Sequence, residues 1–335
     1  MAHPEEVILV KEAYKEEILV KPNVVGVGVG FKVVGNEITG NVAVVVLVRE
    51  KIAREGLPPE GLVPRTINGV PTDVIQVGEL RPMQARTGRW RPAPGGVSIG
   101  HYQISAGTFG AVVRDRASGE RLILSNNHVL ANSNDAQLGD PIIQPGGADG
   151  GQVANDTIAH LERFCPIEFE SRPGTCGLAA AYAGIGNAIA SLLGSSHRLS
   201  TYQANPQAVN LVDAAVARPV SDDVILDEIL EIGEISGTAP ALLGMSIRKS
   251  GRTTGFTTGM VTVLDATVTV NYGIGRNARF ENQIVSGPMS QGGDSGSLLV
   301  DGASQRAVGL LYAGSAQTTI YNPIQAVLDC LEVEI

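Results

Sequence analysis

Short apolar runs separated by glycine-rich turns dominate the chain and predict a protein built mainly from β-strands. The first 80 residues differ, because residues 5–20 carry apolar side chains at helical spacing. Two β-rich runs follow over residues 24–34 and 38–48, and residues 72–77 form a candidate further strand. This order predicts a small α+β domain over residues 1–80.

Glycine alternates with valine in the first of these runs, at Gly26, Gly28 and Gly30. The spacing differs from a dinucleotide-binding loop, and a strand continues through it. We expect these glycines to let the helix pack closely on the sheet. Gly35–Asn36 is a hairpin signal between the two runs.

Residues 81–95 contain four arginines and three prolines, which predict an exposed, extended linker. Two roles fit the module before it. It is either a pro-domain removed by cleavage in the linker, or a retained module for assembly or substrate docking. Retention is favoured because residues 1–6 lack the basic and apolar regions of a secretory signal.

The remaining residues, 96–335, show the strand and turn pattern of a larger β domain, with an insertion at about 148–207. Within the insertion, residues 178–193 predict a helix with an alanine-rich face. This helix is an oligomer contact, a lid or a helix packed on the outside of its own domain. A homo-oligomer is therefore compatible with the sequence.

Composition narrows the function classes. The net charge of −9 over 335 residues argues against nucleic acid as a main ligand. No segment reaches the roughly 20 apolar residues that span a bilayer, so no membrane partner is expected. Three cysteines are few for a disulfide framework. Cys165 and Cys176 could bridge a loop, but free thiols and a cytoplasmic location are the expectation.

The strongest chemical signal is Gly-Asp-Ser-Gly at residues 293–296, directly before an apolar strand. Glycines on both sides of Ser295 allow a sharp turn and a close approach of the backbone to a bound group. The amides of Gly293 and Ser295 can then point at one spot, as an oxyanion hole requires.

A base and a carboxylate for this serine lie upstream. His128 follows the apolar run at residues 122–124, where a strand end would hold it in place. Asp213 is enclosed by small apolar residues, so it is expected to be buried and to need a partner such as an imidazole N–H. Each residue alone has an ordinary structural explanation. Their joint occurrence, in the order His, Asp, Ser, favours a catalytic triad.

Two further motifs carry a family resemblance. Arg-Lys-Ser-Gly-Arg-Thr-Thr-Gly at residues 248–255 precedes Val-Asn-Tyr-Gly at residues 270–273 and then the serine turn. This run resembles the bacterial chymotrypsin-like proteases of the streptogrisin and α-lytic group. It is also similar to the plant narrow-leaf type of trypsin-like peptidases. The resemblance covers residues 96–335 and implies a double β-barrel, attack on peptide bonds and no metal or organic cofactor.

The resemblance also implies a role for each motif residue. Ser295 would be the nucleophile, His128 the general base and Asp213 the residue that orients the imidazole. Asp294 would be buried and paired with an internal cation. The matching cation is Lys249, and Arg248 is the less favoured alternative.

The chain departs from the resemblance in several places. Val129, Arg248 and Met289 stand where secreted relatives have cysteines. Tyr312 stands where relatives have a serine that contacts the triad aspartate. The substrate-binding residues implied by position are Met289, Tyr312, Ala313, Gly314 and Thr319. Met289 near the base of the specificity pocket suggests an apolar side chain before the scissile bond.

These observations predict a mainly β, chymotrypsin-like double barrel with a small N-terminal α+β domain. They favour a serine endopeptidase that acts on protein or peptide substrates. The alternatives from the sequence are a catalytically silent protease fold used for binding or assembly, an esterase and a protease that cleaves only itself.

Overall fold

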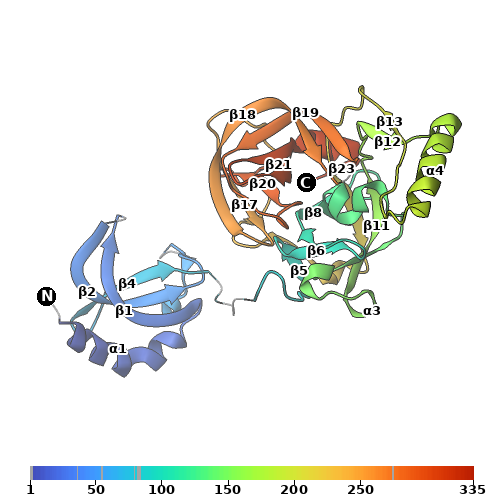
Figure 1. The fold of residues 1–335 in the computed structure, drawn as a ribbon. Helices are drawn as coiled ribbons and strands as arrows, with labels where there is room; N and C mark the ends of the chain where they lie inside the picture. Colours follow the sequence, from blue (N-terminus) through green and yellow to red (C-terminus); the bar gives the residue numbers. More distant parts are fainter. Residues whose placement is uncertain (1–2, 36, 54–55, 79, 81–83, 274) are drawn as a thin grey trace. The chain divides into compact units, whose positions relative to one another are not determined.

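The computed structural model describes residues 3–35, 37–53, 56–78, 80, 84–273 and 275–335. The chain forms two compact units, Met1–Gln84 and Ala85–Ile335. Figure 1 shows the elements of each unit. Residues Asn36, Arg81 and Pro82, on which the predicted hairpin turn and linker partly fall, lie outside the described residues.

The N-terminal unit is a four-stranded sheet with one helix against it. Strand order is β1-β2-β4-β3, with β1 antiparallel and β4 parallel to β2. The elements are α1 (Pro4–Leu19), β1 (Val24–Val34), β2 (Glu37–Val48), the single turn η2 (Pro59–Gly61), β3 (Thr66–Ile67) and β4 (Val70–Gln76). Val7, Val10 and Ile18 of α1 are buried against Val44 and Val46 of β2. Burial of this apolar stripe stabilises α1, as in most amphipathic helices.

The glycines of β1 do not face this helix. Val27 and Val29 belong to the core that contains α1, so the intervening glycines point to the other face of the sheet. A Cβ at Gly26 would meet Leu47, and a Cβ at Gly28 would meet nothing within 4 Å. The expectation that these glycines allow close helix packing is therefore wrong.

The second unit begins with an antiparallel eight-stranded sheet. Its strand order is β23-β8-β9-β14-β11-β10-β6-β7. The strands are β6 (Ser98–His101), β7 (Gly107–Thr108), β8 (Ala111–Asp115), β9 (Arg121–Ser125), β10 (Pro141–Ile143), β11 (Thr157–Phe164), β14 (Ala215–Pro219) and β23 (Val333–Glu334). Three shorter strands form a separate small sheet of order β16-β15-β5: β5 (Ala93–Gly95), β15 (Ile225–Ile229) and β16 (Gly233–Glu234).

A closed six-stranded barrel follows, in the order β17-β18-β19-β22-β21-β20. Its strands are β17 (Ser246–Gly251), β18 (Gly255–Asn271), β19 (Asn277–Ser286), β20 (Leu298–Asp301), β21 (Ala307–Gly314) and β22 (Thr319–Pro323), and α5 (Ile324–Cys330) leaves the last of them. The prediction of a mainly β double-barrel unit preceded by a small α+β unit is confirmed.

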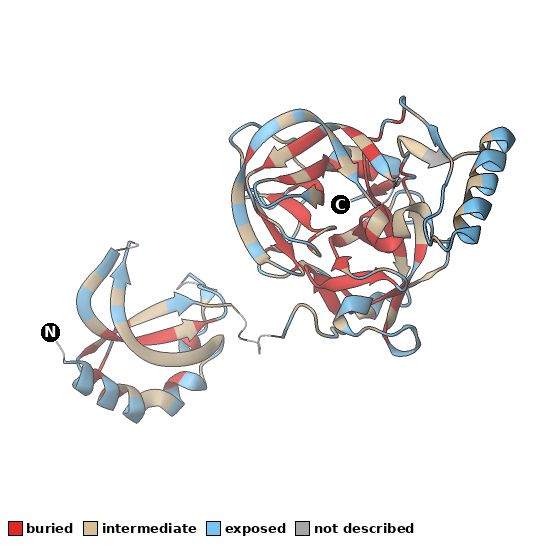
Figure 2. Ribbon diagram, in the orientation of Figure 1, coloured by how far each residue is buried: buried red, intermediate tan, exposed pale blue. Residues whose placement is uncertain are grey.

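Buried side chains explain why the two β domains of this unit form one body. Each has its own core, around residues such as Phe109 and Ile123 in the first and Ile247 and Tyr321 in the second. A third core joins strands of both domains with α5. Figure 2 shows the buried residues, in red, along the strands of both β domains. The shared core fixes the two β domains relative to each other, so side chains from both can form one site where the domains meet.

The insertion is narrower than predicted. Residues 157–164 form β11, a regular strand between β10 and β14, which divides the predicted insertion into a short part before it, with η4 (Gly147–Asp149) and α3 (Val153–Asp156), and a longer segment after it. That segment contains β12 (Ser171–Pro173), α4 (Gly177–Leu192) and β13 (Tyr202–Ala204). Helix α4 has no buried residue and lies at the edge of the unit (Figures 1 and 2).

One disulfide contradicts the predicted cytoplasmic location of the protein. Cys165, just after β11, is bonded to Cys330 at the end of α5, and Cys176 is free and exposed. Disulfides persist in oxidising compartments and are rare in the cytosol. The prediction of free thiols at Cys165 and of a cytoplasmic location is therefore wrong. In the described part of the chain, none of the helices is both long and apolar enough to cross a membrane.

The predicted linker is also corrected in its second half. Strand β5 is buried and pairs in parallel with β15. Arg86 donates to the Ser250 hydroxyl at 2.7 Å, and its backbone carbonyl accepts from Ser98. The Trp90 side chain packs against the core of the first β domain. Residues 85–95 are thus part of the second unit rather than an exposed spacer.

This packing predicts different outcomes for two truncations. A fragment that begins at Ala85 should melt at the same temperature as the second unit of the intact chain. A fragment that begins at Gly96 should melt at least about 10 °C lower, because it loses β5 and the Arg86 and Trp90 contacts, worth several kcal/mol. Differential scanning calorimetry of both fragments tests this, and equal melting temperatures would contradict it.

Candidate active site

Strand pairing brings the candidate base and carboxylate together. Strands β9 and β14 are antiparallel neighbours in which Ser125 lies opposite Ala215. His128 follows Ser125 by three residues, within the short helix α2 (Asn127–Leu130), and Asp213 precedes Ala215 by two. In an antiparallel pair the end of one strand meets the start of the other, so both side chains emerge at the same edge of the sheet.

Asp213 is fully buried and tied to His128 by two hydrogen bonds. Its Oδ2 lies 2.6 Å from Nδ1 of His128, and its Oδ1 accepts from the His128 backbone N–H at 3.2 Å. Its own backbone is fixed as well. Asn126 donates to its carbonyl at 2.7 Å, and its N–H donates to Asn322 at 2.9 Å. A carboxylate bonded to Nδ1 holds the proton there and leaves Nε2 free to accept one.

Ser295 lies in the loop before β20, and glycines shape that loop. Gly293 and Gly296 have φ of +96° and +94°, a region that favours glycine. A Cβ at Gly296 would lie 2.4 Å from the Thr108 carbonyl oxygen. The Ser295 carbonyl accepts from the Thr108 N–H at 2.7 Å, which anchors the loop to the first β domain.

The same loop presents two unused amides. The Gly292 carbonyl accepts from the Thr253 hydroxyl at 2.8 Å, and the Gly293 carbonyl from the Thr108 hydroxyl at 2.9 Å. Because carbonyl and N–H point in opposite directions in a trans peptide, the N–H of Gly293 is turned away from Thr253. Among the hydrogen bonds of the described residues, none uses the N–H of Gly293 or of Ser295.

Asp294 and Lys249 form a buried ion pair beneath this loop. Lys249 Nζ lies 3.2 Å from Asp294 Oδ2, and both side chains are fully buried. The other carboxylate oxygen accepts from the N–H groups of Thr253 at 2.8 Å and Thr254 at 3.1 Å. Asp294 therefore joins the serine loop to the Thr-Thr-Gly segment. Arg248 points elsewhere, with its Nε buried and without a hydrogen-bond partner.

The surroundings keep Asp294 ionised. Burial is the largest influence on the pKa of Asp294 and acts to raise it. The Thr254 hydroxyl, the Lys249 charge and the Gln291 amide together outweigh burial and hold this pKa below its ordinary value. Burial in turn lowers the pKa of Lys249, against the opposing pull of Asp294. Each charge thus helps to stabilise the other in this interior.

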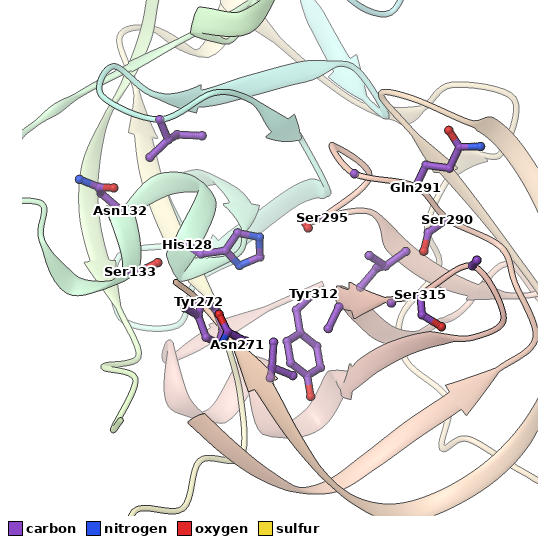
Figure 3. A pocket seen from close by; sticks show the side chains of 17 residues that line it. His128, Asn132, Ser133, Asn271, Tyr272, Ser290, Gln291, Ser295, Tyr312 and Ser315 are labelled. Carbon is purple, nitrogen blue, oxygen red and sulfur yellow. The ribbon is translucent and has the colours of Figure 1, made fainter. Parts of the chain in front are cut away.

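His128 and Ser295 line one open pocket of about 680 Å³ (Figure 3). Ser290, Gln291 and Gly292 form part of its wall. His128 and Ser295 share no hydrogen bond among those of the described residues. In proteins without substrate such bonds are often long and tighten only in the reacting complex.

The predicted substrate-binding residues divide into two groups. Tyr312, Ala313 and Gly314 line the pocket. Met289 is buried in the core of the second barrel, where it lies 3.4 Å from the Tyr321 hydroxyl. Thr319 is fully buried and accepts from the Met289 N–H. These two residues lie behind the pocket wall, so Met289 provides no basis for the predicted apolar preference.

One residue of the site was missed by sequence reasoning. The Tyr272 hydroxyl donates to Asp213 Oδ2 at 2.7 Å. Its ring stands edge-on to the His128 imidazole, with centroids 5.9 Å apart. Tyr272 belongs to the Val-Asn-Tyr-Gly run that was noted only as a family motif. No local signal in the sequence shows that Tyr272, which follows β18, contacts Asp213, which precedes β14.

Fold and candidate site have a known arrangement. A His-Asp pair on one β domain and a Gly-Asp-Ser-Gly loop on the other correspond to the fold of the chymotrypsin-like serine proteases.

Solved structures similar to this chain include bacterial proteases of that kind. Nocardiopsis protease is 17% identical with a TM-score of 0.46, and Thermobifida fusca protease A is 14% identical with a TM-score of 0.45. An alpha-lytic protease homologue, N4, is 16% identical with a TM-score of 0.46. Each match covers 72% of this chain and 98% of the other. No protein-family model matches the chain.

Proposed function

We propose that this protein is a serine endopeptidase that hydrolyses peptide bonds through an acyl-enzyme. The observation that carries the proposal is one pocket lined both by the carboxylate-bound imidazole of His128 and by Ser295, whose loop also carries two unused amides. Acyl transfer needs a base, a nucleophile and donors for the oxyanion, and these groups supply each of them.

The proposed reaction follows from the hydrogen bonds. His128, with its Nδ1 proton held by Asp213, accepts the Ser295 hydroxyl proton at Nε2 as the oxygen attacks the carbonyl carbon. The N–H groups of Gly293 and Ser295 stabilise the negative oxygen. The imidazolium then protonates the leaving amine. Water, deprotonated by the same imidazole, releases the acyl group and restores Ser295.

Labelling with a fluorophosphonate tests the proposal, because this electrophile reacts with a serine that a neighbouring base activates. Intact protein should be labelled, and the Ser295→Ala variant should not. Folded wild-type protein that resists both the probe and peptide hydrolysis would favour the silent protease fold instead.

The pocket also predicts the charge of the preferred substrate. None of the described residues that line it is Asp, Glu, Lys or Arg. A charged side chain before the scissile bond would lose water without gaining a counter-ion, which costs several kcal/mol. Substrates with a neutral residue there should have kcat/KM at least about 100-fold above those with Arg, Lys, Asp or Glu.

A peptide library read by mass spectrometry measures this preference. The Ser290→Asp variant supplies a matched comparison, since Ser290 lines the pocket and its hydroxyl lies 3.0 Å from that of Thr319. The variant should gain cleavage after Arg and Lys. Efficient wild-type cleavage after either residue would contradict the prediction.

A further inference from the structure

Asp213 receives a hydrogen bond from outside its own β domain. His128 follows β9 and Asp213 precedes β14, both strands of the eight-stranded sheet. Tyr272 instead follows β18 of the closed barrel. Its hydroxyl donates to the same Oδ2 that binds Nδ1 of His128. The orientation of the carboxylate therefore depends on a residue of the opposite barrel.

The Tyr272 side chain is held firmly enough to set this orientation. Its backbone N–H donates to the Arg276 carbonyl at 2.8 Å, within the turn between β18 and β19. Its ring packs against Phe169 and Phe280 as well as His128, with centroids 5.9, 6.2 and 5.9 Å away. Burial, more than the neighbouring Asp213 charge, raises the pKa of Tyr272 well above its ordinary value. The hydroxyl thus stays protonated and remains a donor.

The nearby Tyr312 shows what the same side chain does without this bond. It stands on β21, where the family resemblance places a serine that contacts the aspartate. Its hydroxyl is buried and has no hydrogen-bond partner among the described residues. In Figure 3 this hydroxyl points away from His128. Tyr312 fills the space beside Phe280, at a centroid distance of 4.8 Å, and supplies no donor to the carboxylate.

We infer that Tyr272 is the positioning residue of the Asp213–His128 pair, and that it supplies from the β18–β19 turn the hydrogen bond that the strand residue Tyr312 does not. For catalysis, the inference rests on the proposed protease function. The arrangement fixes Oδ2 between two donors, the imidazole N–H and the phenol O–H. A carboxylate held from two sides keeps the imidazole facing Ser295.

The inference predicts that the Tyr272→Phe variant differs from wild type in two quantities, kcat and the pH midpoint of the His128 titration. The titratable groups that act on Asp213 are His128, Tyr272 and Tyr312, and the two tyrosines stay neutral. Removing the Tyr272 hydroxyl leaves the carboxylate with one donor fewer, so it holds the imidazolium proton more tightly. Tyr272→Phe should therefore raise the pH midpoint of the His128 titration by about half a unit or more. It should lower kcat about tenfold with KM within about twofold, because a hydrogen bond to a charged group is lost.

The experiment combines NMR titration of the His128 ring with pH profiles of peptide hydrolysis, on the full-length protein. Tyr312→Phe, which removes the unpartnered hydroxyl, should leave the titration midpoint where it is. Tyr321→Phe controls for loss of a buried hydroxyl in the same barrel, since the Tyr321 hydroxyl bonds to Ser286 at 3.0 Å, and should also leave it unchanged.

An unchanged His128 midpoint in Tyr272→Phe would overturn the inference, as would equal shifts in all three variants. The titration does not require activity, so it separates two failures. Wild-type protein that neither hydrolyses peptides nor reacts with a fluorophosphonate would refute the protease proposal, while the titration would still decide whether Tyr272 controls the Asp213–His128 pair.

Discussion

Replacing Ser295 with alanine is expected to lower kcat/KM for peptide hydrolysis by at least about 10⁴-fold, the largest effect of any single change. The oxygen that forms the acyl bond is lost, while the unused amides and the pocket remain. Stability should change by no more than about 0.5 kcal/mol, because the partly exposed Ser295 side chain makes no hydrogen bond among those of the described residues. Steady-state kinetics and thermal unfolding of the purified variant measure both.

His128→Ala offers the matched comparison. Residues that act as one unit give non-additive losses. The Ser295→Ala and His128→Ala double variant should therefore be no slower than the slower single variant. If the two losses multiplied instead, Ser295 and His128 would be acting separately and the proposed mechanism would fail.

Lys249→Met is expected to have the second largest effect and to act on stability as well as activity. The change leaves the Asp294 carboxylate fully buried without its cation. Breaking a buried pair in this way costs about 3–5 kcal/mol of unfolding free energy. Because Asp294 holds the loop that carries the Gly293 and Ser295 amides, fluorophosphonate labelling should be lost as well. Urea unfolding and the labelling rate test the two effects.

A double-mutant cycle and a neighbouring cation make this test specific. Adding Asp294→Asn to Lys249→Met removes both charges. The double variant should therefore lose less unfolding free energy than the two single variants lose together, with a coupling energy of about 2 kcal/mol or more. Arg248→Met removes the adjacent cation, which does not bind Asp294, and should cost far less. Wild-type stability and labelling in Lys249→Met would show that the ion pair does not support the site.

The sequence predicted the elements with strong local signals. The helical spacing in residues 5–20 and the valine-rich run at residues 24–34 correspond to α1 (Pro4–Leu19) and β1 (Val24–Val34). The helix predicted at residues 178–193 is α4 (Gly177–Leu192). Periodicity within one segment is enough for such predictions, because the pattern reflects the spacing of side chains on a single helix or strand.

Predictions that depended on which surface a residue faces were weaker. The glycines of β1 were assigned to the wrong face of the sheet, and Met289 to a pocket that it lies behind. The disulfide was missed because Cys165 and Cys330 are 165 residues apart in the chain. The absence of the relatives' cysteines at Val129, Arg248 and Met289 carried no information about a bond elsewhere.

By itself, the sequence determined the fold class, the order of the candidate residues His128, Asp213 and Ser295, and the glycines that shape the serine loop. These features are encoded in local spacing and in short motifs. Only the tertiary structure decided which partners surround Asp213 and which residues line the pocket. Tyr272 and Tyr312 have the same side chain, yet only the Tyr272 hydroxyl reaches the carboxylate. The physical reason is that hydrogen bonding depends on the position and direction of atoms, which long-range packing of the two barrels sets.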